Sequence, residues 1–323
     1  MFDELHKYPK WKSYLKGYFD TFRNQLATIV TGSARLDVYR HGGDSLLGRY
    51  WLIHLNPFSL SEVAGNMNPR PPDELSGESN KEDIETLKSL MRWGGFPEPF
   101  LSRSDAMHRR WLTMRRERLI QEDLRDLSKI HDLSHIDNLM DLVIESVGSI
   151  LSVNSLRESL QVSYNAVKTW LGWLETIYYC FRIPPYSKSI ARALKKEAKY
   201  FLFDWSEVTD PGARFENMIA MHLKKSVDFW NDVGEGTFAL HYVRDLEKRE
   251  VDFLVLRDKK PWMLVECKLQ GDDIPKSLHH MTTALKPIHS VLVTSEEIAA
   301  KYRVVNEKKY WVTGAAAFLK HFV

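Results

Sequence analysis

The stretch EVDFLVLRDKKPWMLVECKLQ, residues 250–270, constrains the fold more than any other part of the sequence. Its two runs VDFLVL and WMLVECKL are rich in β-branched and aliphatic residues and have the length of strands. The segment RDKKP between them is polar and contains residues that favour turns. The pattern therefore predicts an antiparallel β-hairpin.

Charged side chains are expected to converge on one patch of this hairpin. Alternate residues of a strand point to the same face, so Glu266 and Lys268 share a face. The turn suggests a register in which Arg257 pairs near Trp262. Asp252 then lies opposite Glu266 and Lys268, to within one residue. The sequence thus predicts two carboxylates and an ammonium together beside a hydrophobic sheet.

Such a patch has a chemical use. Two carboxylates can hold a hard cation such as Mg²⁺, which makes Asp252 and Glu266 the expected metal ligands. The metal polarises a phosphodiester and lowers the pKa of bound water, while Lys268 orients the nucleophile or neutralises developing charge. Upstream, the amphipathic helix in ARFENMIAMHLKKSV carries Glu216 as a further ligand or orienting group. The expected catalytic residues are Glu216, Asp252, Glu266 and Lys268.

The order of these residues also carries a family resemblance. A helix glutamate, a strand aspartate and a Glu-x-Lys on the next strand, with Gln270 two residues further on the same face, resemble the PD-(D/E)XK nuclease-like superfamily. The resemblance implies a nuclease-like mixed sheet over residues 207–323 and Mg²⁺-dependent phosphodiester cleavage. Members of that superfamily can lose catalysis and keep the fold. A non-catalytic module that binds DNA or a protein therefore stays open as the alternative.

Residues 85–206 are expected to form a helical domain that contains a winged helix-turn-helix. The stretch SLRESLQVSYNAVKTWLGWLETI predicts two short helices with a tight turn. The runs YYCFRIPPYSK and YFLFDWS predict strands on either side of a basic segment that includes Lys199. The residues expected to bind DNA are Lys168, Lys188, Arg192, Lys195 and Lys196.

Two observations keep a non-DNA interpretation of this domain open. Winged helices also serve as packing or protein-contact modules. Lys168 is a single cation on the second helix, which is little for the recognition of bases. The basic segment could still contact phosphates, since those contacts need charge rather than base edges. The five arginines between Arg109 and Arg118 favour a solvated helix face with internal ion pairs over a nucleic-acid groove.

Residues 1–64 have an α/β pattern. Apolar residues recur at helical spacing between Trp11 and Phe22, LATIVTGSA predicts a short buried strand, and WLIHLNPF is a further strand-like run. The following residues 65–84 are rich in proline, acids and small polar residues, which indicates a linker. RWGGFPEPF, residues 92–100, predicts a rigid turn.

Taken as a whole, the chain resembles the C-terminal two-thirds of a family of bacterial and archaeal AAA-type ATPases. Members carry a P-loop module, a winged helix and a nuclease-like domain of uncharacterised function. The stretches that carry the resemblance are FDELHKYPKWKSYLK, IVTGSARLD, LLGRY, LNPFSLSE, RWGGFPEP and FENMIAMHL. The resemblance implies that Asp3 helps to hold Mg²⁺ and Glu4 activates water. It further implies that Ser33 senses the γ-phosphate and that Arg49 contacts nucleotide or a neighbouring subunit.

One motif of that family is absent from the sequence. No G-x-x-x-x-G-K-[ST] occurs in the 323 residues, so no loop grips the β- and γ-phosphates. ATP belongs to the full-length family, and we do not expect this chain to bind or hydrolyse it. Residues 1–64 are then either a remnant of an AAA ATPase module or the start of a truncated or misassigned reading frame.

Composition sets the outer limits. A net charge of +2 excludes a strongly basic protein, so any contact with nucleic acid must be local. Cys180 and Cys267 lie far apart without metal-type spacing, which suits core residues in a reducing compartment. No stretch approaches the roughly eighteen apolar residues of a membrane span. We expect a cytoplasmic multidomain protein, α/β plus α+β, with DNA, a protein or a second copy as partner.

Overall fold

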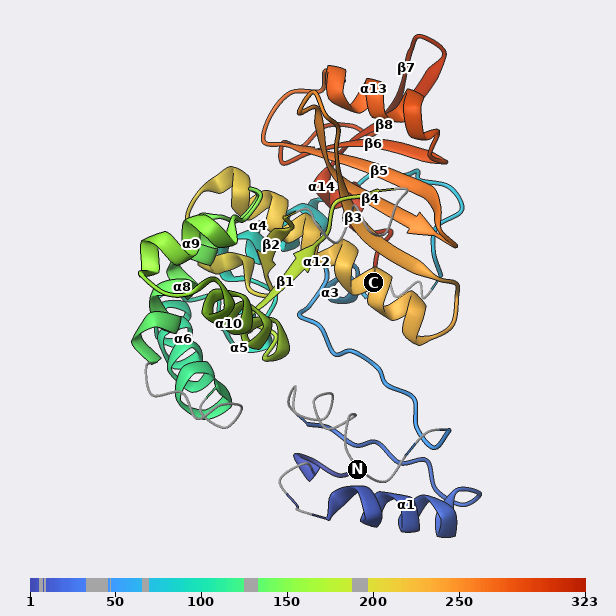
Figure 1. The fold of residues 1–323 in the computed structure, drawn as a ribbon. Coiled ribbons are helices and arrows are strands. Elements are labelled where there is room, and N and C mark those ends of the chain that lie inside the picture. The colour runs from blue at the N-terminus through green and yellow to red at the C-terminus, as the bar shows by residue number, and fades with distance from the viewer. Residues whose placement is uncertain are drawn as a thin grey trace.

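The chain is arranged in three successive parts, seen in a computed structural model that describes residues 1–5, 8, 10–32, 46, 48–65, 70–124, 133–187 and 197–323 (Figure 1). A small N-terminal part lies away from the rest of the molecule. A helical middle part follows, and the C-terminal part is built around a mixed β-sheet (Figure 1). None of the described helices has both the length and the apolar composition needed to cross a membrane.

The N-terminal part consists of helix α1 (Trp11–Phe22) packed beside extended chain. The ring of Phe2 meets Tyr14 and Tyr18 edge to face, at centroid distances of 5.7 and 5.3 Å. The expectation of a buried strand in LATIVTGSA is wrong for its described residues. Val30 makes an isolated parallel bridge to Phe2, and Ile29 beside it is exposed. One isolated bridge is too little backbone pairing to form a strand.

The strand-like run WLIHLNPF is likewise not a strand. Trp51 and Leu55 are 93% and 98% exposed, because no neighbouring strand pairs with this segment among the described residues. The same run contacts the C-terminal part, since His54 Nδ1 lies 2.8 Å from Asp232 Oδ2. Helix α3 (Leu60–Val63) begins shortly after the run ends.

The described part of the predicted linker is a packed loop. Leu75 is fully buried, and its carbonyl accepts a 2.7 Å hydrogen bond from the Tyr302 hydroxyl. The loop ends at a capping box in which Asn80 and Asp83 exchange side-chain to backbone hydrogen bonds, and helix α4 (Lys81–Trp93) begins there.

The predicted turn RWGGFPEPF has a packing reason for its two glycines. Gly94 has a φ of +77°, and a Cβ there would lie 2.5 Å from Asp204 Oδ1. A Cβ on Gly95 would lie 2.5 Å from the Trp205 ring. The glycines therefore let the end of α4 lie directly against η4 (Trp205–Glu207), before helix α5 (Pro97–Ser102) starts.

The middle part contains the helices and strands that the sequence predicts. Its elements are α6 (Asp105–Arg118), the π-helical η3 (Leu119–Leu124), α8 (Leu133–Glu145), α9 (Val153–Leu160), α10 (Tyr164–Thr176), β1 (Cys180–Ile183) and β2 (Lys199–Leu202). Helices α9 and α10 are separated by a tight turn at Gln161, whose φ is 55°. Strands β1 and β2 form an antiparallel pair. A winged helix remains a prediction for this arrangement.

Two of the five arginines of α6 pair with other elements rather than within their own helix as expected. Arg115 Nη1 lies 2.7 Å from Glu207 Oε1 in η4, and Arg116 Nε lies 2.6 Å from Asp137 Oδ1 in α8. Facing elements offer carboxylates that local sequence does not reveal. These arginines therefore hold the middle part together.

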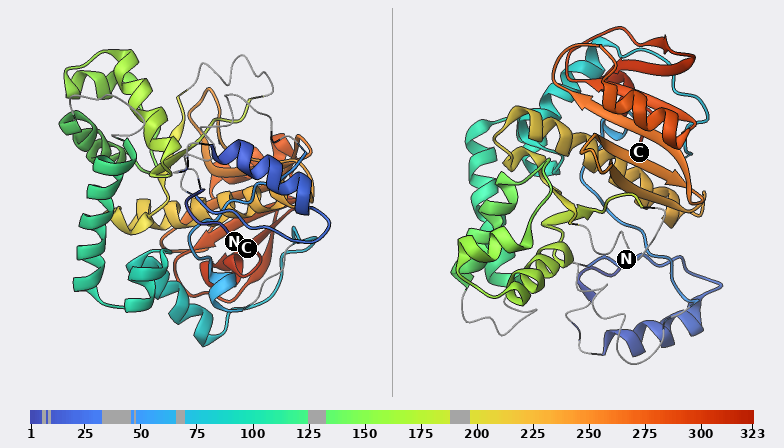
Figure 2. Two further views of the ribbon diagram at one scale, coloured as in Figure 1. Left: turned by 90° about the horizontal axis from the view of Figure 1, so that it is seen from below. Right: turned by 45° about the horizontal axis from the view of Figure 1, so that its top comes forward.

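The C-terminal part is a six-stranded sheet with a helix on each face. The sheet has the order β3-β4-β5-β6-β8-β7, with β5, β6 and β8 parallel and the other neighbours antiparallel. Helices α12 and α13 pack on opposite faces (Figures 1 and 2). The elements are α12 (Pro211–Asp232), β3 (Phe238–Arg244), β4 (Glu250–Arg257), β5 (Lys260–Lys268), α13 (Lys276–Leu285), β6 (His289–Thr294), β7 (Lys301–Val305), β8 (Lys308–Gly314) and α14 (Ala315–Leu319).

Two apolar clusters fill the two sides of this sheet. The smaller one, with Leu254, Leu264 and Met281, lies under α13. The larger one includes Phe253 and Trp230 and continues into the middle part through residues such as Phe201. The middle and C-terminal parts thus share one continuous core, which fixes β2 against α12 and β4.

Candidate functional site

The hairpin formed by β4 and β5 confirms the predicted antiparallel pair. Phe253 pairs with Val265, so the same register places Asp252 opposite Glu266. The expected pairing at the turn is wrong, because Arg257 pairs with Lys260 rather than near Trp262. A register shift between Val255 and Leu256 absorbs the difference. The bulge lets a tight turn and an Asp252–Glu266 pairing coexist.

Glu216 joins this pair from helix α12. The helix begins at Asp210, whose side chain accepts a 2.8 Å hydrogen bond from the Ala213 amide. Glu216 lies in the second turn and is largely buried. The loop before α9 closes over it, since a Cβ on Gly148 would lie 2.9 Å from Glu216 Oε2. Gly148 has a φ of +79°, so glycine suits this position for two reasons.

Lys199 corrects the expectation for the basic segment. The sequence groups it with the exposed lysines of a wing, whereas its side chain in β2 is 2% exposed. Its Nζ lies 3.1 Å from Glu216 Oε1, 2.7 Å from Glu250 Oε1 and 3.9 Å from Asp252 Oδ1. Neither Lys199 nor Glu250 is predicted as a site residue. Lys199 directly precedes the apolar run YFLF, residues 200–203, and this position is a sequence signal that could have marked it.

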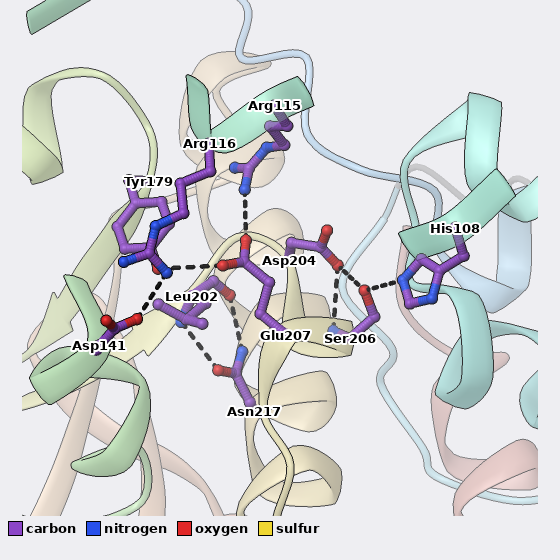
Figure 3. A network of polar contacts seen from close by, with 10 residues as sticks. All are labelled: His108, Arg115, Arg116, Asp141, Tyr179, Leu202, Asp204, Ser206, Glu207 and Asn217. Carbon is purple, nitrogen blue, oxygen red and sulfur yellow. Dashed lines mark hydrogen bonds and ion pairs between the residues drawn. The ribbon is translucent and has the colours of Figure 1, made fainter. Parts of the chain in front are cut away.

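The network in Figure 3 joins β2 and the chain after it to the neighbouring helices. The side-chain amide of Asn217 accepts a 2.9 Å hydrogen bond from the Leu202 N–H and donates one of 2.8 Å to the Leu202 carbonyl. This holds α12 against β2 next to Glu216. In the same network Glu207 binds both Arg115 and the Tyr179 hydroxyl, which anchors the chain directly after β2 (Figure 3).

Burial and crowding shift the titration of the carboxylates. Burial, followed by the charge of Asp252, raises the pKa of Glu216 to about 8 and that of Glu266 to about 8. Burial also raises the pKa of Asp252. For Lys199 burial acts to lower the pKa, but Glu216, Asp252 and Glu250 together raise it above its ordinary value. The site therefore contains more carboxylates than it can easily keep ionised.

The two carboxylates of this pair differ in their hydrogen-bond partners among the described residues. Asp252 Oδ2 accepts a 2.8 Å hydrogen bond from the Cys267 amide, and its Oδ1 is beyond hydrogen-bond distance of Lys199. Glu266 Oε2 is buried and has no hydrogen-bond partner among the described residues. Within those residues, no three His, Cys, Asp or Glu side chains are arranged to hold a metal ion. Two carboxylates are nevertheless the usual protein contribution to a Mg²⁺ site.

Lys268 lies at the edge of the site. Its Nζ donates a 3.2 Å hydrogen bond to the Asp273 carbonyl. Its charge reaches Glu266 and partly counteracts the rise in the pKa of that carboxyl. Burial raises the thiol pKa of both Cys180 and Cys267, which disfavours the nucleophilic thiolate.

The residues predicted in the N-terminal part have ordinary partners. Asp3 Oδ1 accepts a hydrogen bond from the Thr31 hydroxyl, and Arg49 Nε lies 3.0 Å from Asp20 Oδ1 of α1. Glu4 directly follows Asp3 with a φ of 50°. Ser33 lies outside the described residues.

The residues predicted to bind DNA can be placed only in part. Lys168 is exposed on α10, as a DNA-contacting residue would have to be. The other members of the predicted set lie outside the described residues, namely Lys188, Arg192, Lys195 and Lys196.

Comparison with known proteins divides the chain in the same way. The family model described as an AAA domain matches residues 1–64, and those of two domains of unknown function match residues 84–207 (DUF8612) and 211–312 (DUF4143). The AAA and DUF4143 matches support an AAA-type, ATPase-like family. An uncharacterized protein of Methanocaldococcus jannaschii is 20% identical over 297 residues. That alignment covers 89% of this chain and 65% of the relative, so the chain spans less than two thirds of the relative's length. No solved structure matches the chain significantly.

Proposed function

We propose that the C-terminal half of this AAA-type ATPase-like protein engages DNA and cleaves phosphodiester bonds with Mg²⁺. The observation that carries the proposal is the convergence of three buried carboxylates, Glu216, Asp252 and Glu266, with two lysines nearby. Perturbed carboxylates of this kind cluster at functional sites more often than elsewhere. The order helix, three antiparallel strands, helix, parallel strand supports a nuclease-like domain.

The chemistry assigns a role to each residue. Asp252 and Glu266 would hold the metal, since Glu266 Oε2 has no hydrogen-bond partner among the described residues and Asp252 Oδ1 lies 3.9 Å from Lys199 Nζ, beyond hydrogen-bond distance. A bound Mg²⁺ would supply charge to polarise a phosphodiester and lower the pKa of water. Lys268, on the same strand as Glu266, neutralises negative charge that develops on the phosphate. Glu216 orients the site from α12.

DNA would reach this site from the middle part. Helices α9 and α10 with the β1–β2 pair support a winged-helix interpretation, and Lys168 is exposed on α10. Contacts of this type are expected to be electrostatic and to depend strongly on salt. We therefore infer binding to the DNA backbone rather than recognition of a base sequence.

A non-catalytic module is the second candidate, and Lys199 favours it. Its ammonium is within hydrogen-bond distance of Glu216 and Glu250, so part of the carboxylate cluster already has a cation. On this alternative the cluster is a structural ion-pair network, and the domain binds DNA or a protein without cutting. Metal dependence separates the two candidates.

The test is cleavage of plasmid and oligonucleotide DNA with Mg²⁺ or Mn²⁺. We expect cleavage by the wild type and loss of it in Asp252→Ala and Lys268→Ala. Cleavage by both variants at the wild-type rate would refute the catalytic proposal. DNA binding is measured in the same samples at low salt; its absence in all three proteins would favour a protein partner.

For residues 1–64 we propose a part of an AAA ATPase module that does not hydrolyse ATP by itself. The AAA match, the parallel bridge between Phe2 and Val30, and the missing G-x-x-x-x-G-K-[ST] support this. The purified chain should show no ATPase activity. An activity that is abolished by Glu4→Gln would contradict the proposal.

A further inference from the structure

Lys199 lies in the middle of a cluster of carboxylates. Three carboxylates from two elements surround its Nζ, at 2.7, 3.1 and 3.9 Å. Glu216 comes from α12, and Glu250 and Asp252 come from β4. Buried carboxylates that share so small a space need a cation between them. A hard divalent cation would take the same oxygen ligands.

The ammonium is held in place from several sides. Its Nζ lies 5.8 Å from the centre of the Tyr242 ring, and the bond pair between Asn217 and Leu202 fixes β2 on α12. Glu250 is further shared with Arg244, whose Nη1 lies 3.4 Å from Glu250 Oε2. Glu250 is thus neutralised by two side chains of the protein itself and is not available to a metal.

Glu266 lies on β5, next to Asp252 on β4, and its buried Oε2 has no hydrogen-bond partner among the described residues. Asp252 Oδ1, by contrast, faces Lys199 Nζ at 3.9 Å. The cluster is therefore divided into a half that contains Lys199 and a half at Glu266, whose Oε2 makes no hydrogen bond to a cation among the described residues. Asp252 borders both halves.

We propose that Lys199 is a built-in cation that takes the place of a second divalent metal, so that the cluster holds at most one metal ion per chain. Lys199 is a positioning residue: it fixes Glu216 and Asp252 without touching the substrate. The limit of one metal rests on the proposed Mg²⁺ site between Asp252 and Glu266. The role of Lys199 as internal cation does not depend on catalysis.

The test compares Lys199→Met, which keeps the length of the side chain and removes its charge, with Lys199→Arg, which keeps the charge. Isothermal titration calorimetry with Mn²⁺ measures the number of ions bound by the full chain. Thermal unfolding with and without Mn²⁺ measures the effect of these ions on the Tm. We expect Lys199→Met to bind one Mn²⁺ more than the wild type. Its Tm should rise by about 5 °C with saturating Mn²⁺ beyond any rise in the wild type. Lys199→Arg should behave as the wild type.

An equal number of Mn²⁺ ions in Lys199→Met and the wild type would overturn the proposal. Two ions at this cluster in the wild type, lost in Asp252→Asn, would also overturn it. If Lys199→Met does not fold without metal, recovery of folding with Mn²⁺ supports the proposal and failure to recover contradicts it. In the double variant Lys199→Met/Glu216→Gln the cation and one carboxylate are removed together, and the wild-type count should return.

The outcomes also separate this inference from the proposed function. A wild type that binds no Mn²⁺, together with a Lys199→Met variant that binds one, would support the internal cation and refute the metal-dependent nuclease. A wild type that cleaves DNA with one bound metal ion, together with an unchanged number of bound Mn²⁺ ions in Lys199→Met, would support the metal-dependent nuclease and refute the internal cation.

Discussion

Acidic residues follow or flank apolar residues in two regions of the molecule. In only one of these regions are the carboxyl groups brought together in a cluster. In the N-terminal part, Asp3 and Glu4 follow Phe2, which makes one isolated bridge. In the C-terminal part, Asp252 and Glu266 lie on central strands of a six-stranded sheet. Burial there raises the pKa of Glu266 to about 8. The environment that the sheet creates, and not the residue types alone, therefore determines the chemical properties of an acidic motif.

Packing accounts for this difference. Trp51 and Leu55 remain exposed because the N-terminal part offers them no second layer among the described residues. The C-terminal sheet is covered by α12 and α13, and Leu264 in its centre is fully buried. A carboxylate next to such a core loses water, whereas Asp3 in the N-terminal part stays exposed.

The largest expected effect is on cleavage. Glu266→Gln should lower the Mg²⁺-dependent rate by at least about 100-fold, because it removes a charged metal ligand from the site. Glu4→Gln is the matched change in the N-terminal part and should leave the rate within about 2-fold, since this carboxylate has no role in the reaction. Initial rates on a labelled oligonucleotide measure both. An equal loss of cleavage rate in Glu266→Gln and Glu4→Gln would contradict the claim that only the C-terminal acids take part in cleavage.

Truncation of one apolar side chain in each region should differ almost as clearly. Leu264→Ala should cost about 3 kcal/mol of unfolding free energy through lost burial and a cavity. Leu55→Ala should cost less than about 0.5 kcal/mol, because the side chain is 98% exposed. Denaturant unfolding followed by fluorescence measures the change. A large cost for Leu55→Ala would show that an unseen surface covers the N-terminal part.

A pair of glycine substitutions should change stability in opposite directions. Gly95→Ala should destabilise by about 2 kcal/mol or more, because its Cβ would lie 2.5 Å from the Trp205 ring and 2.8 Å from the Phe58 carbonyl. Gly17→Ala in α1 meets nothing within 4 Å and should stabilise that helix by up to about 1 kcal/mol. Hydrogen exchange of the two segments reports each effect locally. Stabilisation by Gly95→Ala would contradict the close approach of α4 to η4.

The smallest effect is a slope of stability with pH. The pKa of Glu216 and of Glu266 is raised from 4.5 to about 8 in the folded protein. The folded state therefore binds more protons than the unfolded state between these pH values, and the contribution of the two carboxyl groups to stability is lost as the pH rises from about 4.5 to 8. Burial lowers the pKa of His222 to about 4, which makes stability rise with pH up to about 6.5 and not beyond.

Stability should therefore fall between about pH 6.5 and 8, by up to about 1.4 kcal/mol per pH unit for each carboxyl. Urea unfolding at a series of pH values measures this slope. Glu266→Gln should flatten it. A wild-type stability that rises over this range would contradict the assigned burial.

The sequence predicts well what depends on neighbouring residues. The β4–β5 hairpin, α12 and the α9–α10 pair follow from local apolar patterns, and the order of the acids is visible in the letters. The pairing of Asp252 with Glu266 follows within one residue, but the bulge that permits it does not. A bulge depends on the fit of the whole sheet.

What the sequence misses depends on distant contacts. Lys199 has the appearance of a wing lysine because its neighbours in sequence are basic, and its carboxylate partners lie 17 or more residues away. Arg115 similarly finds Glu207 across the middle part. The strand-like runs of the N-terminal part fail for the opposite reason. They have strand propensity, but the described structure offers them almost no pairing partner.

The most direct test of the distinction between the two acidic pairs is Mn²⁺ binding by the intact chain, followed by electron paramagnetic resonance of the free ion. Three proteins are compared: the wild type, Asp252→Asn/Glu266→Gln and Asp3→Asn/Glu4→Gln. We predict that the wild type and the N-terminal double variant bind one Mn²⁺ with the same affinity, and that the C-terminal double variant binds none. Binding that is lost in the N-terminal variant and kept in the C-terminal one would contradict this account.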